Sequence, residues 1–266
     1  MDFTKVQRGE ISSFSLLSRA TRISSLMHRP SALVHLVNFA FFQTDTSGAI
    51  WGTDSWADPI VLFGPYNWNP TEGSKERCSW DGPSTKSCNT HDDEKGLIHL
   101  VKSAGAEIYP SLGGWTLSDA FPAMAAVASA RATFAQNCID LIVEYDFDGR
   151  RLPGFRRCLL LLLCLTSLHS SPCPPFPKGI DIDWEYPGYV DHSGTPQDRD
   201  NFKLLLNDVR SKLDELGAQT GKFYGLTAAL PCGPDHISNM DIAHVASTLS
   251  QLNLMTYGEF LQLLLR

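Results

Sequence analysis

The sequence lacks an apolar segment long enough to span a membrane, and it lacks a recognisable secretory signal. Its most apolar segment, Cys158 to Leu168, is too short to cross a bilayer. Its first 30 residues contain no uninterrupted apolar core, so they do not form a secretory signal; they are rich in Ser and Arg and resemble a transit peptide, or are foreign to the domain. We therefore expect no membrane partner, and we predict that residues 1–31 are an extension outside the folded domain.

Positive charge is also scarce over most of the chain. The 22 Lys and Arg against 29 Asp and Glu give a net charge of −7, and many of the basic residues gather in residues 1–30 and 150–178. The remainder is therefore strongly acidic, which argues against nucleic acid as a partner and suits a neutral substrate such as a sugar polymer.

The spacing of the histidines and cysteines does not indicate a metal site or a cofactor. The eight histidines show no ligand spacing. Three of the seven cysteines lie in residues 150–178. Cys78 and Cys88 flank a short polar loop and could form a disulfide or remain reduced, whereas Cys138 lies on a helical apolar stripe and is expected in the core.

The most informative segment is GIDIDWEYPG, residues 179–188, because acidic residues occupy every second position of an expected strand. Asp181, Asp183 and Glu185 then share one face, about 6 to 7 Å apart along the strand. Three such carboxylates in a poorly hydrated place cannot all stay ionised, so their pKa values separate and one acid is held protonated. A solvated acidic face or a divalent metal site are the alternatives for this alternation taken alone.

Strands and helices alternate from Ala32 onward, which predicts an α/β fold with a parallel sheet. The expected strands are Leu33 to Phe42, Glu107 to Leu112, the acidic segment, Tyr224 to Leu230, and Leu252 to Tyr257. The expected helices are Asp92 to Ala104, Ala130 to Tyr145, one bearing Phe202 to Leu216, and Met240 to Leu249.

Three segments, in order, resemble the family 18 glycoside hydrolases, the chitinases and their relatives. The acidic segment is similar to the family's DGxDxDxE strand, Ser111 to Trp115 to its SxGG segment, and Leu254 to Tyr257 to its MTYD segment. The resemblance implies a (β/α)8 TIM barrel over residues 32–257. The barrel is incomplete here, with strands two to six recognisable, no candidate for strand one before Ala32, and strands seven and eight missing.

The resemblance also implies residue roles. Glu185 would protonate the glycosidic oxygen, while the substrate's own acetamido group attacks the anomeric carbon, as the family does without a carboxylate nucleophile. Asp183 would orient that group, Asp181 would exchange a proton with Asp183, and Tyr257 would hydrogen-bond the acetamide oxygen. The expected substrate-binding residues are Ser111, Gly113, Gly114, Trp115 and Tyr186.

The same resemblance implies an extracellular monomer that acts on chitin or chitooligosaccharides without a cofactor. Two other functions stay open. The chain could be a chitin-binding lectin on the same scaffold, although such lectins usually lack the acid at Glu185, or it could be a catalytically impaired product of a chitinase gene.

Two departures from the family pattern affect the expected site. The Asp-Gly that opens the motif occurs at Asp148-Gly149, and residues 150–178 interrupt the strand, so that Lys178 stands before Gly179. Gly258 occupies the position of the family's Asp after Tyr257. We interpret residues 150–178 and the tail 258–266 as translated introns, since the former are rich in residues with pyrimidine-rich codons. A genuine surface insertion is the alternative.

Overall fold

The structure, a computed structural model, describes residues 13–16, 36–54, 58, 61–62, 79–80, 86–87, 96–103, 106–144 and 178–256. Its strands are β1 (Ser13–Leu16), β2 (Leu36–Thr44), β3 (Ile50–Gly52), β4 (Ser79–Trp80), β5 (Lys86–Ser87), β6 (Glu107–Gly113), β7 (Lys178–Asp183), β8 (Tyr224–Pro231) and β9 (Gln251–Met255). Its helices are α3 (Leu97–Ser103), α4 (Phe121–Ala126), α5 (Ala128–Glu144), α7 (Asp198–Thr220), α8 (Pro234–Ile237) and α9 (Ile242–Thr248), with 3-10 turns η2 (Trp115–Leu117) and η3 (Val190–His192).

One curved sheet organises the domain. Its strands follow the order β1-β2-β6-β7-β8-β9, and every neighbouring pair in this path is parallel. The short β3 adds antiparallel to β2, and β4 pairs only with β5 among the described strands. Consecutive parallel strands linked through helices are the repeating unit of a barrel. The predicted incomplete (β/α)8 barrel is therefore confirmed.

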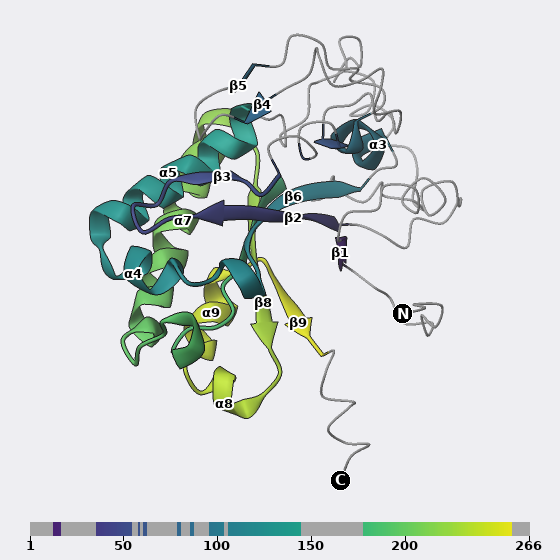
Figure 1. The fold of residues 1–266 in the computed structure, drawn as a ribbon. Helices are drawn as coiled ribbons and strands as arrows, with labels where there is room; N and C mark the ends of the chain where they lie inside the picture. The colour runs from purple at the N-terminus through teal and green to yellow at the C-terminus, as the bar shows by residue number, and fades with distance from the viewer. Residues whose placement is uncertain are drawn as a thin grey trace, which may run out of the picture.

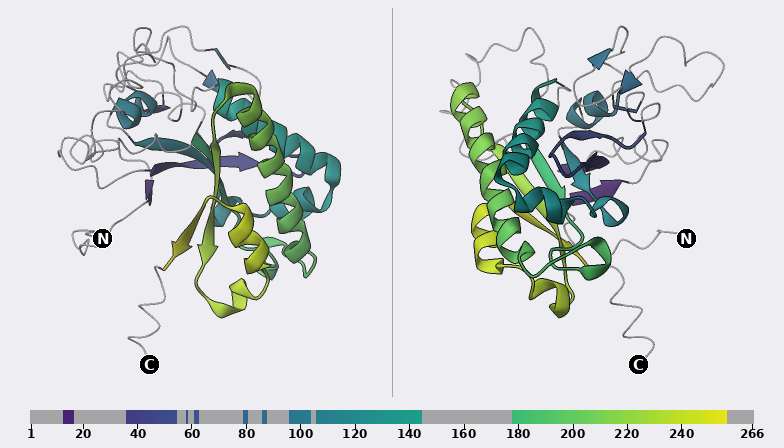
Figure 2. Two further views of the ribbon diagram at one scale, coloured as in Figure 1. Left: turned by 180° about the vertical axis from the view of Figure 1, so that it is seen from behind. Right: turned by 60° about the vertical axis from the view of Figure 1, so that its left-hand side comes forward.

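The helices α4, α5, α7 and α9 lie along one face of this sheet, as both orientations show (Figures 1 and 2). The alternation of the acidic segment explains how β7 contacts them: Ile180, Ile182 and Trp184 are buried on the helix side. Trp184 stacks on Phe121 of α4, with ring centroids 5.5 Å apart, and meets Phe202 of α7 edge-on at 5.7 Å. These aromatic contacts join the sheet to its helical layer.

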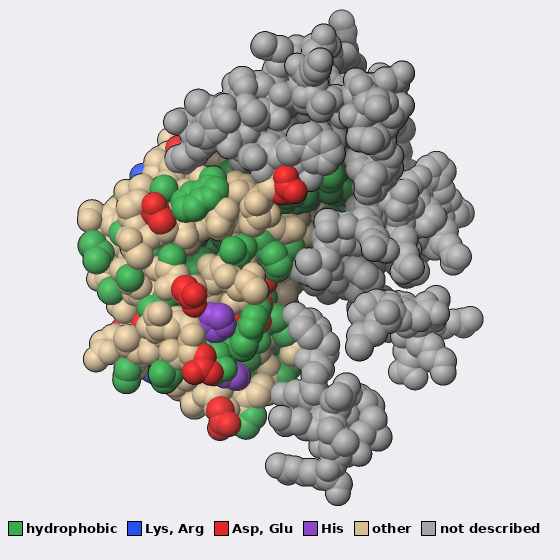
Figure 3. Space-filling model, in the orientation of Figure 1, with side chains coloured by type: hydrophobic (Ala, Val, Ile, Leu, Met, Phe, Trp, Pro, Cys, Tyr) green, Lys and Arg blue, Asp and Glu red, His purple; other side chains and the backbone are tan. Residues whose placement is uncertain are grey.

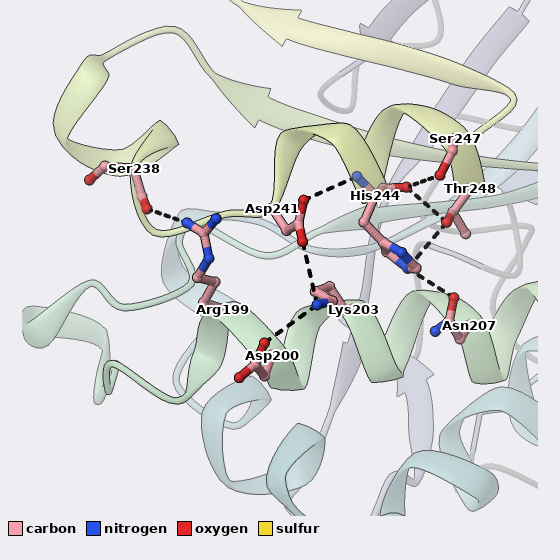
Figure 4. A network of polar contacts seen from close by, with 9 residues as sticks. All are labelled: Arg199, Asp200, Lys203, Asn207, Ser238, Asp241, His244, Ser247 and Thr248. Carbon is pink, nitrogen blue, oxygen red and sulfur yellow. Dashed lines mark hydrogen bonds and ion pairs between the residues drawn. The ribbon is translucent and has the colours of Figure 1, made fainter.

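Polar contacts join α7 to α9 on the outside of that layer (Figure 4). Asp241 caps α9 by accepting the backbone N–H of His244 at 3.2 Å, and it pairs with Lys203 of α7 at 3.4 Å. His244 Nε2 lies 3.0 Å from Asn207 Oδ1 of α7. Each polar side chain of this network has a partner inside it, so its role is to hold the two helices together.

Three expectations about the elements need correction. A strand does precede Ala32: β1 pairs parallel with β2, and its four residues are too few to show a periodicity. The first long strand continues to Thr44, two residues beyond the expected end at Phe42, while residues 33–35 of the expected strand lie outside the described residues. The acidic strand ends at Asp183, where its pairing with β6 ends, so Glu185 lies just beyond β7.

The structure also bears on the predictions about the cysteines and about membrane-spanning segments. Cys138 is buried and reduced in α5, as predicted. The proposed Cys78 to Cys88 disulfide lies outside the described residues. Within the described part of the chain, no helix combines the length and hydropathy required to cross a membrane.

Candidate active site

The predicted site residues meet where β6 and β7 end. The two strands are parallel neighbours, with Ser111 opposite Asp181 and Gly113 opposite Asp183. Both strands therefore finish at the same edge of the sheet, which is the edge where barrel enzymes place their active sites.

Asp181 is the centre of a buried polar layer inside the curve of the sheet. Its carboxylate accepts hydrogen bonds from Ser111 Oγ of β6 at 2.7 Å, Thr227 Oγ1 of β8 at 2.5 Å and Asn253 Nδ2 of β9 at 2.9 Å. Asn38 of β2 donates a further hydrogen bond to it. Burial raises the pKa of Asp181, and these four donors oppose the rise. The layer holds Asp181 rigidly as an acceptor.

Asp183 and Glu185 form a carboxyl pair above Asp181. Burial raises the pKa of Asp183 well above its ordinary value, and the nearby charges of Glu185 and Asp181 raise it further. Burial also raises the pKa of Glu185, whereas hydrogen bonds from the Tyr186 phenol, the Trp115 backbone N–H and Asp183 oppose the rise, as does the charge of His192. Asp183 therefore keeps its proton more readily than Glu185 does, and it donates a hydrogen bond to the Glu185 carboxylate.

The loop after β6 holds the backbone around Glu185 in place through hydrogen bonds. Gly113 and Gly114 have φ angles of +113° and +96°, and a Cβ on Gly113 would collide with the carbonyl oxygen of Asp183. This close approach lets the Gly114 N–H donate to that oxygen at 2.7 Å. Ser118 then accepts the backbone N–H of Glu185 at 2.9 Å. The loop therefore fixes the backbone on which the acid is carried.

Aromatic rings surround the mouth of the site. Trp115 is 48% exposed and lies 6.2 Å from the Tyr186 ring, while Tyr186 packs on His236 of α8 at 4.5 Å. The space-filling view shows histidine and acidic side chains beside apolar ones on this face, toward α8 (Figure 3). A flat exposed indole beside buried carboxyls suits contact with the apolar face of a ring-shaped ligand.

Of the residues predicted from the sequence, eight are brought together here: Ser111, Gly113, Gly114, Trp115, Asp181, Asp183, Glu185 and Tyr186. Tyr257 lies outside the described residues, as does Asp148. Lys178 opens β7 at the position of the family's first Asp, so the described acidic row begins at Asp181. Among the described residues, no group of three or more His, Cys, Asp or Glu side chains is arranged to hold a metal ion.

Sequence reasoning missed three of the four donors around Asp181, and it missed Ser118, which accepts the Glu185 N–H. Asn38, Thr227 and Asn253 each lie between two apolar neighbours in their strand. A polar side chain inside an otherwise apolar strand needs a buried partner. This signal could have identified all three, whereas Ser118 lies in a loop and gives no such signal.

The chain is similar to proteins of one known family. The family model described as "Glycosyl hydrolases family 18" matches residues 12–150 and 177–262. The chain belongs to this family. The match leaves a gap at the place where the sequence predicts an insertion, and it includes β1; the boundaries of the domain and the insertion stay predictions.

Curated relatives within family 18 are chitinases by name. The chain is 31% identical to chitinase A1 of Niallia circulans over 201 residues, which cover 74% of this chain and 24% of that protein. It is 29% identical to chitinase 1 of Aphanocladium album over 231 residues, which cover 86% of this chain and 43% of that protein. The chain thus spans less than half the length of either relative.

Solved structures of family 18 proteins show the same fold. A chitinase from Bacillus thuringiensis matches 92% of this chain with a TM-score of 0.58 and 22% identity, over 39% of its own length. A family 18 N-acetylglucosaminidase from Paenibacillus barengoltzii matches 94% of this chain with a TM-score of 0.54 and 19% identity, over 54% of its own length.

The raised pKa of Asp183 predicts a pH-dependent cost to stability. Between the unfolded-state pKa, about 3.9, and the raised folded-state pKa, the folded protein binds more protons, so stability falls as pH rises. We expect Asp183→Asn to remove this cost. In thermal unfolding followed by circular dichroism, its Tm should exceed that of the unmodified chain at pH 8, with the excess shrinking toward pH 4.

Asp241 is the matched control, because its pKa is shifted in the opposite direction to that of Asp183. The backbone N–H of His244 and the charge of Lys203 hold the pKa of Asp241 below its ordinary value, so its stabilising contribution is present above the unfolded-state pKa and is lost on acidification. We expect Asp241→Asn to lower Tm more at pH 8 than at pH 4. A gain for Asp183→Asn that did not grow with pH would contradict the assignment of a buried proton to Asp183.

Proposed function

We propose that this chain hydrolyses β-1,4-glycosidic bonds between N-acetylglucosamine units of chitin or chitooligosaccharides, with Glu185 as the general acid. The observation that carries the proposal is the hydrogen-bonded carboxyl pair of Asp183 and Glu185 at the carboxyl end of β7. Membership of a glycosyl hydrolase family supports it, as do the curated relatives named chitinases.

The pair supplies the proton that bond cleavage requires. Glu185 is nearest the mouth, 9% exposed, and its pKa is raised by burial. The shared proton passes from Asp183 to Glu185 across their hydrogen bond. Glu185 can then protonate the glycosidic oxygen as the glycosidic bond breaks. After cleavage the Glu185 carboxylate accepts a proton from the incoming water, and passage of that proton back to Asp183 returns the pair to its starting state.

The nucleophile in this proposal comes from the substrate. The acetamido carbonyl oxygen attacks the anomeric carbon and forms an oxazolinium ion, which water opens with retention of configuration. Asp183 Oδ1 is buried and has no hydrogen-bond partner among the described residues, so it is available to accept the acetamido N–H. Asp181 adds negative charge beneath the cationic intermediate, and Tyr257 would bind the acetamide oxygen.

Substrate binding is assigned to the residues around this pair. Ser111, Gly113 and Gly114 form the floor, while Trp115 and Tyr186 offer aromatic faces at the mouth. The family likeness also leads us to propose an extracellular location and a monomer.

The experiment that tests the proposal measures turnover and binding together. We expect the chain to release the fluorophore from a fluorogenic chitooligosaccharide and to sediment with chitin beads. Sedimentation with chitin but without turnover would indicate a lectin-like chitin-binding protein and not an enzyme. Absence of both would support the remaining reading, a catalytically impaired product of a chitinase gene.

A further inference from the structure

A histidine outside the family-like motif contacts the loop that holds the acid. His192, in η3, packs edge-on against Trp115 with ring centroids 4.7 Å apart, and Tyr189 lies 5.6 Å from each of these two rings. Trp115 belongs to the loop after β6, whereas Tyr189 and His192 belong to the segment after β7. The three rings therefore join two loops that are far apart in the sequence.

An ion pair holds this histidine in place. His192 Nδ1 lies 2.7 Å from Asp119 Oδ1, and Asp119 belongs to the same loop as Trp115. The His192 side chain is only 13% exposed, although the Asp119 side chain is 68% exposed. His192 is thus clamped from two directions, by a ring and by a carboxylate, both carried by residues 114–119.

The clamped loop also holds Glu185 in place. The Trp115 N–H donates to the Glu185 carboxylate, and Ser118 Oγ accepts the Glu185 N–H at 2.9 Å. Movement of the loop would change both contacts at once. His192 also acts directly, because its positive charge opposes the rise that burial causes in the pKa of Glu185.

We propose that His192, held by Asp119, is a positioning residue that fixes the loop 114–119 against Glu185. Its charge then lowers the upper pH limit at which Glu185 still holds a proton. The proposal rests on the proposed function only for the second part, since the position of the loop does not depend on turnover. The titratable groups around His192 are Asp119, Glu185 and Tyr189. Two more contact Tyr189: Asp191 accepts its phenol at 2.9 Å, and the His236 ring lies 5.2 Å from its ring.

The first test does not require activity. The Trp115 amide donates to the Glu185 carboxylate, so its ¹⁵N chemical shift in an NMR titration of the full chain reports the ionisation of Glu185. We expect His192→Gln to move the midpoint of this titration to higher pH, by roughly half a unit, because a nearby positive charge is lost. His244→Gln is the matched control, because His244 also joins two elements by a polar contact, on the outer helical layer; it should leave the midpoint unchanged.

Two variants of Asp119 test whether its contact with His192 holds the loop in position. Asp119→Asn keeps an oxygen that can accept from His192 Nδ1, whereas Asp119→Ala removes it. We expect the Trp115 amide of Asp119→Asn to keep its wild-type chemical shift at pH 5 more closely than that of Asp119→Ala. An unchanged titration midpoint in His192→Gln, or identical shifts in the two Asp119 variants, would overturn the proposal.

The second test uses turnover of the fluorogenic chitooligosaccharide. We expect His192→Gln to shift the basic limb of the kcat/KM profile to higher pH by the same amount as the NMR midpoint, a change that a merely structural role would not produce. An unmoved limb would refute the role in setting the pH limit. If the unmodified chain shows no turnover, the proposed function fails, and the NMR midpoint still decides whether His192 acts on Glu185.

Discussion

Glu185→Gln should lower the rate of chitooligosaccharide hydrolysis by about 10²- to 10⁴-fold, the usual contribution of a positioned general acid. Gln has nearly the shape of Glu and can keep the contact with the Trp115 N–H through its carbonyl oxygen. It cannot pass a proton to the leaving oxygen at neutral pH. We therefore expect kcat to fall while sedimentation with chitin beads is unchanged. Initial rates with the fluorogenic substrate, measured beside the bead assay, give both quantities.

The matched control for this variant is Glu215→Gln on α7. Glu215 is 54% exposed and pairs with Lys212 at 2.8 Å, away from the carboxyl ends of the strands. Its replacement should leave both turnover and binding unchanged. Activity that survives in Glu185→Gln at the level of the Glu215→Gln control would assign the acid to another residue.

The largest loss of stability is expected from Trp184→Ala. Trp184 is 1% exposed, and it lies between the two acids in the sequence but on the opposite face, against Phe121 and Phe202. Removal of a buried indole leaves a cavity between sheet and helices and costs about 3 to 5 kcal/mol of unfolding free energy. Urea denaturation followed by far-ultraviolet circular dichroism measures this loss as a lower midpoint.

Two further variants make that result specific. Trp184→Phe retains an aromatic ring for the stack on Phe121, so its loss should be smaller. Phe223→Ala removes an aromatic ring that is 59% exposed and lies over Arg210, so the unfolding free energy should change by less than about 1 kcal/mol. A Trp184→Ala chain as stable as Phe223→Ala would show that the segment after β7 does not pack on α4 and α7.

The sequence was most informative about local patterns. Alternation within residues 180–185 predicted which side chains face the helices and which face the site, because successive strand residues point to opposite sides. Periodic apolar positions predicted α5 and α7 to within a few residues. Strand ends were less predictable, since β7 stops where its pairing with β6 ends at Gly113 and Asp183 rather than where its alternation ends.

By itself, then, the sequence determined the acidic row and the alternation of strands and helices, and its resemblance to family 18 determined the barrel class. The tertiary structure decided the partners: Asn38, Thr227 and Asn253 around Asp181, Ser118 beneath Glu185, and Asp119 beside His192. The physical reason is the separation along the chain between the residues that interact. Alternation is a property of adjacent residues, whereas a hydrogen bond between residues 72 positions apart, such as Asn253 and Asp181, depends on strand register and loop packing that only the folded chain establishes.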